Sequence, residues 1–227
     1  NVDVDPEEGL IVRGQAARGI GGDLGIHLYL VDGAWTPGIF HKWDIDQLEV
    51  LRGSQSTVGS SAGGTFGMRY IDPSLLHSGR FMINYEPDAR DSEVGFAHGG
   101  PLIDDTLAFR FAVYERRRDG RVSNSLTQAR DWSSLDESYA RFKLTWFPNF
   151  IEGDELSSEV YYLSNDNYGS NWLNQVGADG SAAYDRITAI ERQVFFHQEL
   201  SDLRFRYKAQ LTDRIDVHAI ASYHTNT

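Results

Sequence analysis

Hydrophobic and polar residues alternate along the second half of the chain. In the segment 107–114, Leu, Phe, Phe and Val occupy every second position, and similar alternation recurs in the segments 140–146, 203–211 and 215–223. Successive side chains of a β-strand point to opposite faces, so these segments are predicted to be strands with one apolar and one polar face. A weaker alternation at 81–85 predicts a further strand.

The connections between these segments alternate in length. The stretches "GGPLIDD" (99–105), "PNFIEGD" (148–154) and "TDR" (212–214) are short, whereas those at about 117–137 and 164–191 are long and polar. Short turns at one end and long loops at the other are typical of an outer-membrane β-barrel, although a soluble β-sandwich also alternates. Charges on the polar faces favour the barrel. So do aromatic residues near the segment ends, as interface girdles require: Tyr85, Trp146, Phe147, Tyr161, Tyr162 and Tyr223.

The first 75 residues differ from the rest in composition and in hydrophobic pattern. They carry most of the glycines and hold short apolar pieces such as "LIVRG", "IHLYLVDG" and "LEVLRG". This pattern predicts a small mixed domain of short strands and tight glycine turns. We therefore expect a mostly β protein with two parts, residues 1–75 and residues 76–227.

Composition and charge exclude several classes of protein. A net charge of −12 argues against non-specific binding to nucleic acid, whose phosphates require clustered Lys and Arg. The chain has no cysteine, which excludes disulfides and cysteine-ligated metals, and it has no apolar run long enough for a transmembrane helix. The histidines are scattered and no nucleophile elbow is present. The sequence therefore predicts no enzyme, no catalytic residue, no metal site and no cofactor.

The stretch "LEVLRGSQSTVGSSAGGTFGMRYIDP" (48–73) resembles the end of the plug domain of TonB-dependent outer-membrane receptors. In that family a strand reading roughly E-V-L-R-G-P-Q-S-T precedes a Gly/Ala segment, a final plug strand and a D-P or R-P dipeptide. Upstream, "LIVRGQAARGIGGDLGIHLYLVDGAW" is similar to the preceding plug section. Downstream, "GGPLIDDTLAFRFAVYERRRDGRVSN" and "YARFKLTWFPN" are similar to the first barrel hairpins. Ser54 and Gly67 depart from the usual Pro and Asn.

The resemblance implies the later part of a plug followed by the first strands of a transmembrane β-barrel, in the outer membrane of a Gram-negative bacterium. About seven strands use about 21 residues each, so a barrel of roughly 22 strands would need on the order of 470 residues. The chain is therefore expected to be a fragment, and the segment that contacts TonB is expected to precede it. The family takes up scarce substrates such as siderophores, cobalamin or oligosaccharides. A passive outer-membrane pore and a soluble β-rich carbohydrate-binding protein remain alternatives.

Three groups of residues are candidates for function. The resemblance implies that charged plug residues pair with the barrel wall, for which we expect Glu49 and Arg52, although Arg52 could also simply cap its strand. The long loops could meet an anionic substrate or lipopolysaccharide, or could be ordinary solvated loops; their candidates are Arg116, Arg117, Arg118, Arg121, Arg130, Trp132 and Trp172. The polar strand faces are expected to line a wet lumen through Arg141, Lys143, Arg204, Arg206 and Lys208.

Overall fold

The computed structural model of the chain consists of β-strands and their connections. It describes residues 2–5, 9–12, 15–16, 27–36, 41–52, 64–88, 90–120, 123–124, 134–148, 150–151, 153–168, 175–176, 182–183, 187–188 and 195–227. These ranges contain strands but no helix, in agreement with the mostly β fold expected from the sequence. Within them, therefore, no helix is long and apolar enough to cross a membrane.

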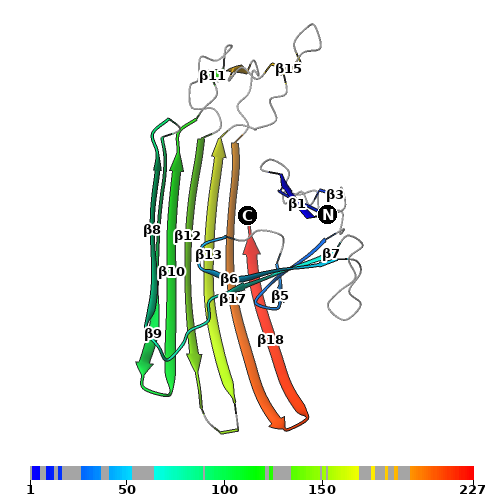
Figure 1. Ribbon diagram of the computed structural model, residues 1–227, viewed down its shortest axis with the longest axis vertical. Coiled ribbons are helices and arrows are strands. Elements are labelled where there is room, and N and C mark those ends of the chain that lie inside the picture. The colour runs from blue at the N-terminus through cyan, green and yellow to red at the C-terminus, as the bar shows by residue number, and fades with distance from the viewer. Residues whose placement is uncertain are drawn as a thin grey trace.

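The largest unit is a seven-stranded antiparallel sheet, here called the wall, which stands upright in Figure 1. Its strands, in order across the sheet, are β18 (Ile215–Asn226), β17 (Phe195–Thr212), β13 (Glu155–Tyr168), β12 (Ser134–Trp146), β10 (Leu107–Arg118), β9 (Asp91–Ile103) and β8 (Ser78–Glu86). Each strand pairs with the next wall strand in the sequence. All five segments predicted from alternation lie in this sheet, which confirms that prediction.

From β9 onward, the connections of the wall follow the predicted alternation in length; the link β8–β9 at the upper end is also short. The links β9–β10, β12–β13 and β17–β18 are short and lie at the lower end in Figure 1. The long links β10–β12 and β13–β17 lie at the upper end. Within the long links the structure describes only short strands: β11 (Ser123–Asn124), β14 (Gln175–Val176), β15 (Ala182–Ala183) and β16 (Ile187–Thr188).

A four-stranded sheet, here called the inner sheet, precedes the wall. Its order is β5 (Ala34–Trp35), β4 (His27–Val31), β7 (Gly64–Tyr70) and β6 (Ile45–Arg52). The sheet is mixed, because β4 and β7 are parallel whereas the other pairs are antiparallel. Figure 1 shows its strands crossing the wall rather than following it. A separate small sheet contains β1 (Val2–Asp5), β2 (Gly9–Val12) and β3 (Gln15–Ala16).

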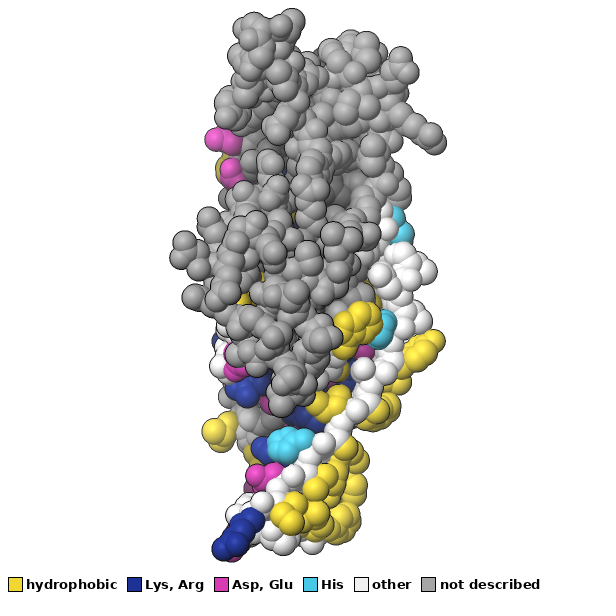
Figure 2. Space-filling view, turned by 90° about the vertical axis from the view of Figure 1, so that its right-hand side faces the viewer, with side chains coloured by type: hydrophobic (Ala, Val, Ile, Leu, Met, Phe, Trp, Pro, Cys, Tyr) yellow, Lys and Arg dark blue, Asp and Glu magenta, His cyan; other side chains and the backbone are white. Residues whose placement is uncertain are grey.

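The two faces of the wall differ sharply in burial. On the outward face, Val113, Phe142 and Val160 are 44%, 44% and 55% exposed. On the inward face, which the inner sheet covers, Ala112 and Arg141 are only 0% and 2% exposed. Figure 2 shows hydrophobic side chains gathered along one side of the lower part of the molecule, beside the charged ones. The predicted alternation therefore separates an exposed apolar face from a buried polar face.

Strand register arranges the outward side chains in rows. One row is wholly apolar or aromatic over the five strands from β10 to β18, and it continues on β9 with His98: Phe111, Phe142, Val160, Leu203 and Tyr223. A row nearer the upper end is charged: Arg117, Asp136, Asp166 and His197. The apolar rows run from Leu107 to Val113 on β10, and seven residues extend about 24 Å along a strand. Barrel strands are tilted by about 35–45°, so these rows span somewhat less than the band of about 25 Å that faces lipid in outer-membrane barrels.

Candidate functional site: the ion pairs between the two sheets

One carboxylate in the link between β5 and β6 of the inner sheet is bound by two arginines of the wall. Asp44 immediately precedes β6 and has a positive φ of 65°, a conformation that Asp tolerates better than most residues. Its carboxylate accepts hydrogen bonds from Arg110 Nε at 2.6 Å and from Arg141 Nη2 at 2.8 Å. Arg110 Nη2 makes a further contact with the other oxygen. All three side chains are at most 2% exposed, so a single carboxylate joins β10 and β12 to the inner sheet.

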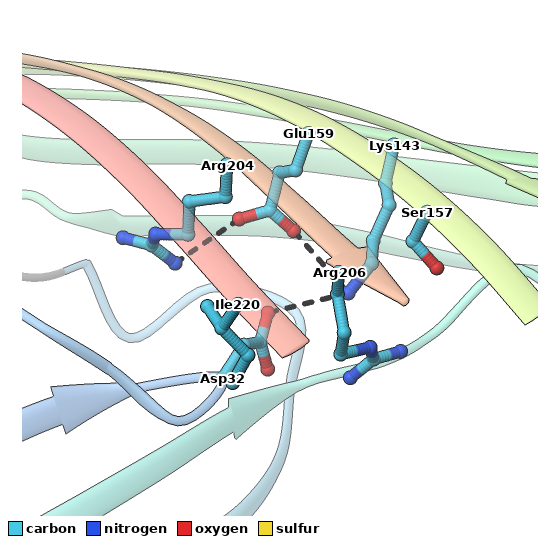
Figure 3. A pocket seen from close by; sticks show the side chains of 7 residues that line it. All are labelled: Asp32, Lys143, Ser157, Glu159, Arg204, Arg206 and Ile220. Atoms are coloured by element: carbon cyan, nitrogen blue, oxygen red, sulfur yellow. Dashed lines mark hydrogen bonds and ion pairs between the residues drawn. The ribbon is translucent and has the colours of Figure 1, made fainter. Parts of the chain in front are cut away.

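A second cluster forms around Lys143 of β12. Its Nζ lies 3.4 Å from Asp32 Oδ2, 2.6 Å from Asp72 Oδ1 and 3.5 Å from Glu159 Oε2. Asp32 occupies the turn between β4 and β5 with φ 50°, followed by Gly33 with φ 84°, and this tight turn points the carboxylate into the wall. Asp72 lies in the link between β7 and β8. Figure 3 shows the Asp32 and Glu159 carboxylates pointing toward the Lys143 ammonium.

Glu159 of β13 joins the two clusters into one layer. Its Oε2 also lies 3.3 Å from Arg141 Nη1, and its Oε1 lies 3.1 Å from Arg204 Nη1. Arg206 extends the layer, because its Nη2 lies 3.1 Å from Asp72 Oδ2. We call this set the ion-pair layer: Asp32, Asp44, Asp72, Arg110, Arg141, Lys143, Glu159, Arg204 and Arg206. A cavity of about 10 Å³ beside it, seen in Figure 3, has room for about one water molecule.

The ion-pair layer holds the inner sheet on the wall only while each buried charge keeps its partner. Three of its carboxylates come from residues outside the wall, whereas all five of its cations come from wall strands. A buried ion pair contributes little relative to a well-packed apolar pair, but removal of one partner leaves an uncompensated buried charge. The inner sheet is therefore held by charges that are stable only while both sheets remain docked.

The surroundings shift the pKa values of two acids of the layer in opposite directions. Burial raises the pKa of Asp32 above its ordinary value, against the attraction of Lys143. Burial acts in the same direction on Asp72, but Lys143 and Arg206 outweigh it and lower the pKa of Asp72. By linkage, Asp72 stabilises the fold above its unfolded pKa near 4, and this contribution is lost as the pH falls through its lowered folded pKa. The contribution of Asp32 is present below about 4 and is lost as the pH rises through its raised folded pKa.

We therefore expect Asp32→Asn and Asp72→Asn to have opposite effects at neutral pH. Asp72→Asn should lower the free energy of unfolding at pH 7, whereas Asp32→Asn should leave it unchanged or raise it. The difference between Asp32→Asn and wild type should shrink toward pH 4, where the wild-type carboxyl is protonated in the folded state. Urea unfolding at several pH values measures both. A larger loss at pH 7 for Asp32→Asn than for Asp72→Asn would contradict the assignment.

An aromatic layer lies next to the ion-pair layer. The His41 ring stacks on Tyr139 at 4.5 Å between centroids and contacts Tyr114 at 4.2 Å. The His41 backbone is held on both sides, because its N–H donates to the Tyr161 hydroxyl at 2.9 Å and its carbonyl accepts from the Tyr70 hydroxyl at 2.7 Å. Burial lowers the pKa of His41 to about 3, so the ring is neutral at physiological pH. The segment before β6 is thus fixed through its backbone by hydroxyls from both sheets.

Tyr161 corrects one sequence-based expectation. It was expected to belong to an interface girdle, but it faces inward and is 2% exposed, because β13 continues beyond it to Tyr168. Its neighbour Tyr162 is exposed on the outward face and donates to Glu199 at 3.1 Å. Parity along the strand, which the segment ends do not reveal, therefore decides which tyrosine is on the outward face.

The adjacent pair of tyrosines offers a matched test. Tyr161→Phe should lower the free energy of unfolding by about 1–3 kcal/mol, because it leaves the buried His41 N–H without an acceptor. Tyr162→Phe removes an exposed hydrogen bond and should change stability by no more than about 0.5 kcal/mol. Urea unfolding of the two variants measures the difference. Equal effects would show that the His41 backbone does not depend on the Tyr161 hydroxyl.

The structure places the five residues expected to line a lumen on the inward face. Arg141, Lys143 and Arg204 are buried in the ion-pair layer, and Arg206 is half-buried there. Lys208 is exposed and lines a groove of about 430 Å³ between the inner sheet and the wall.

The residues expected to join plug and wall are differently placed. Glu49 lines the same groove as Lys208, is exposed, and accepts from Gln47 Nε2 at 2.8 Å. The backbone of Arg52 ends β6, but its side chain lies outside the described residues. Sequence reasoning missed the three aspartates that do contact the wall. Two of them stand in stretches quoted from the sequence, Asp32 in "IHLYLVDG" and Asp72 in the "DP" dipeptide, but neither was singled out as a contact with the wall.

Three of the seven loop candidates lie in β10, and the other four lie outside the described residues. Arg116 donates to Asp91 at 3.0 and 2.7 Å on the inward side of β10, and Arg118 is half-buried on the same side. Arg117 is on the outward face and pairs with Glu115 at 3.2 Å. Four candidates lie outside the described residues: Arg121, Arg130, Trp132 and Trp172. Among the described residues, no group of three or more His, Asp or Glu side chains is arranged to hold a metal ion.

The arrangement of sheets matches known structures across almost the whole chain, although no family model matches the sequence. The ferric yersiniabactin uptake receptor FyuA from Yersinia pestis aligns with a TM-score of 0.82 at 17% identity, over 99% of this chain and 36% of that one. The closed form of the ferric-catecholate import receptor Fiu from E. coli K12 gives 0.75 at 12% identity, over 96% and 30%. The siderophore receptor PiuA from Acinetobacter baumannii gives 0.71 at 16% identity, over 96% and 30%.

These structures define the class of the fold. The chain has the fold of a plug-and-barrel receptor: a mixed inner sheet covered by the first strands of an unclosed barrel wall. The fold is that of the TonB-dependent receptors, which confirms the resemblance found in the sequence. The chain spans about a third of the length of the structures that it matches.

Proposed function

We propose that this chain is part of a TonB-dependent outer-membrane receptor that takes up a ferric chelate with energy supplied through TonB. Residues 1–75 would be the later part of the plug, and residues 76–227 would begin the barrel. The observation that carries the proposal is the ion-pair layer, which attaches a mixed sheet to the polar face of a wall whose other face is apolar. A plug must close the pore and yet move, and buried charges suit that role because they hold firmly only while paired.

The outward face supports a place in the outer membrane of a Gram-negative bacterium. Its apolar rows would face the lipid, and the charged row above them would lie at the level of the lipid headgroups. The upper, long links would then face the exterior and meet the substrate. The arginines and tryptophans named from the sequence remain candidates there, apart from Arg117, whose side chain is on the lipid side.

The substrate class follows from the neighbours. By their names, FyuA and Fiu take up ferric chelates and PiuA is a siderophore receptor. We therefore propose a siderophore-type substrate rather than cobalamin or an oligosaccharide. Glu49 and Arg52 keep their proposed role as plug residues that pair with the wall, since Glu49 faces a groove also lined by Lys208. Bond-making chemistry is not part of the proposal, and an enzyme activity is not expected.

The test measures the uptake of radioactive iron by cells in which the only copy of the parent gene is expressed from an inducible promoter. Iron supplied as hydroxamate, catecholate and phenolate chelates should be taken up in at least one case, and uptake should stop when the inner membrane is de-energised. Energy-independent uptake would favour a passive pore instead. No uptake of any chelate, together with binding of a soluble sugar polymer, would favour the carbohydrate-binding alternative.

A further inference from the structure

Trp43 lies flat against the wall at a glycine. A Cβ atom added to Gly95 would lie only 2.9 Å from the Cε2 and Cζ2 atoms of the Trp43 ring, closer than real Cβ contacts allow. Gly95 is on the inward face of β9, paired with Met82 on one side and Tyr114 on the other. The missing side chain therefore leaves a notch in the wall between two larger residues. The ring also donates through Nε1 to the Phe96 carbonyl at 3.3 Å.

Trp43 is bonded directly to the central acid of the ion-pair layer. The next residue is Asp44, whose positive φ turns its carboxylate toward Arg110 and Arg141. The Trp43 backbone N–H donates to His41 Nδ1 at 2.9 Å, and this bond fixes the chain on the N-terminal side of Trp43. Two adjacent residues, Trp43 and Asp44, therefore both contact the wall.

We propose that the Trp43 ring in the Gly95 notch sets the depth at which the Asp44 carboxylate reaches its two arginines. Trp43 is thus a positioning residue that acts through Asp44, and Gly95 is required because any side chain there lifts the ring. The inference rests on the proposed function, in which the inner sheet closes the pore. It goes beyond that function because it assigns the position of the inner sheet against the wall to one aromatic contact rather than to the charges alone.

The test compares the influx of vancomycin, a large antibiotic, into cells that express the full parent gene product with single and double substitutions. Asp44→Asn should raise influx, and Trp43→Ala and Gly95→Val should each raise it by a similar factor, at least about fivefold if the residues are coupled through one network. Trp43→Phe, which keeps a ring in the notch, should stay near wild type.

The double variants separate positioning from packing. If Trp43 acts through Asp44, then Trp43→Ala adds little to Asp44→Asn, and Gly95→Val adds little to Trp43→Ala. Effects that multiply would overturn the inference, because they would show independent packing. Unchanged influx in Asp44→Asn, with the receptor at normal levels in the outer membrane, would also overturn the inference. The proposed function fails separately, if the wild-type protein shows no energy-dependent uptake of iron chelates.

Discussion

Asp44→Ala is expected to release the inner sheet from the wall. The substitution leaves the Arg110 and Arg141 guanidiniums, both at most 2% exposed, without their main partner. Breaking a buried pair in this way is destabilising by about 3–5 kcal/mol. Urea unfolding of the purified parent gene product, together with vancomycin influx into cells, measures the effect on docking and on closure.

A matched control lies two residues away. Asp46 pairs with Arg69 at 2.8 Å, but the two side chains are 47% and 54% exposed. Exposed pairs of this kind contribute about 0–1 kcal/mol, so Asp46→Ala should leave both stability and influx close to wild type. If Asp44→Ala behaved like Asp46→Ala, the ion-pair layer would not hold the inner sheet.

The second large effect is expected on the outward face of β13. Val160 lies in the middle apolar row, between Phe142 and Leu203, and is 55% exposed. If that face contacts lipid, Val160→Arg places a charge near the bilayer midplane and should cost about 2–4 kcal/mol. Folding of the purified protein into lipid vesicles, followed by urea titration, measures this cost.

Ser164 provides the control on the same strand and the same face. It pairs with Ser138 and Glu199, close to the charged row at the upper end. An arginine near the interface costs only about 0–1 kcal/mol, so Ser164→Arg should be nearly neutral. Equal effects at the two positions would argue that no depth-dependent lipid environment surrounds the strand, as expected for a soluble protein.

The faces of the wall could be predicted from the sequence because they depend only on local alternation. Once 107–114 is a strand, Phe109 and Arg110 must point to opposite sides, whatever they contact. The same local rule explains the error at Tyr161. Tyr161 and Tyr162 were both placed near a segment end, but adjacent residues of a strand point to opposite sides, and β13 continues past them to Tyr168.

The contacts of the ion-pair layer could not be predicted in the same way. Asp44 and Arg141 are far apart in the sequence, and their pairing depends on how two sheets dock. Asp44 also has a positive φ, although no glycine or turn motif in the sequence predicts one there. The resemblance implied charge pairing between plug and wall through Glu49 and Arg52, whereas the described contacts between the inner sheet and the wall use aspartates of the turns and links.

The central claim is that one side of the wall faces lipid and the other faces a plug. The chain has no cysteine, so single cysteines on β13 can carry a spin label once any cysteines elsewhere in the parent gene product are replaced. In vesicles containing the parent gene product, labels at Ser158 and Val160 should collide with dissolved oxygen but not with a water-soluble nickel chelate. Labels at the inward, buried positions Ser157 and Leu163 should collide with neither, until Asp44→Ala admits the nickel chelate. Free collision of the chelate at Val160, or at Leu163 with Asp44 intact, would contradict the account.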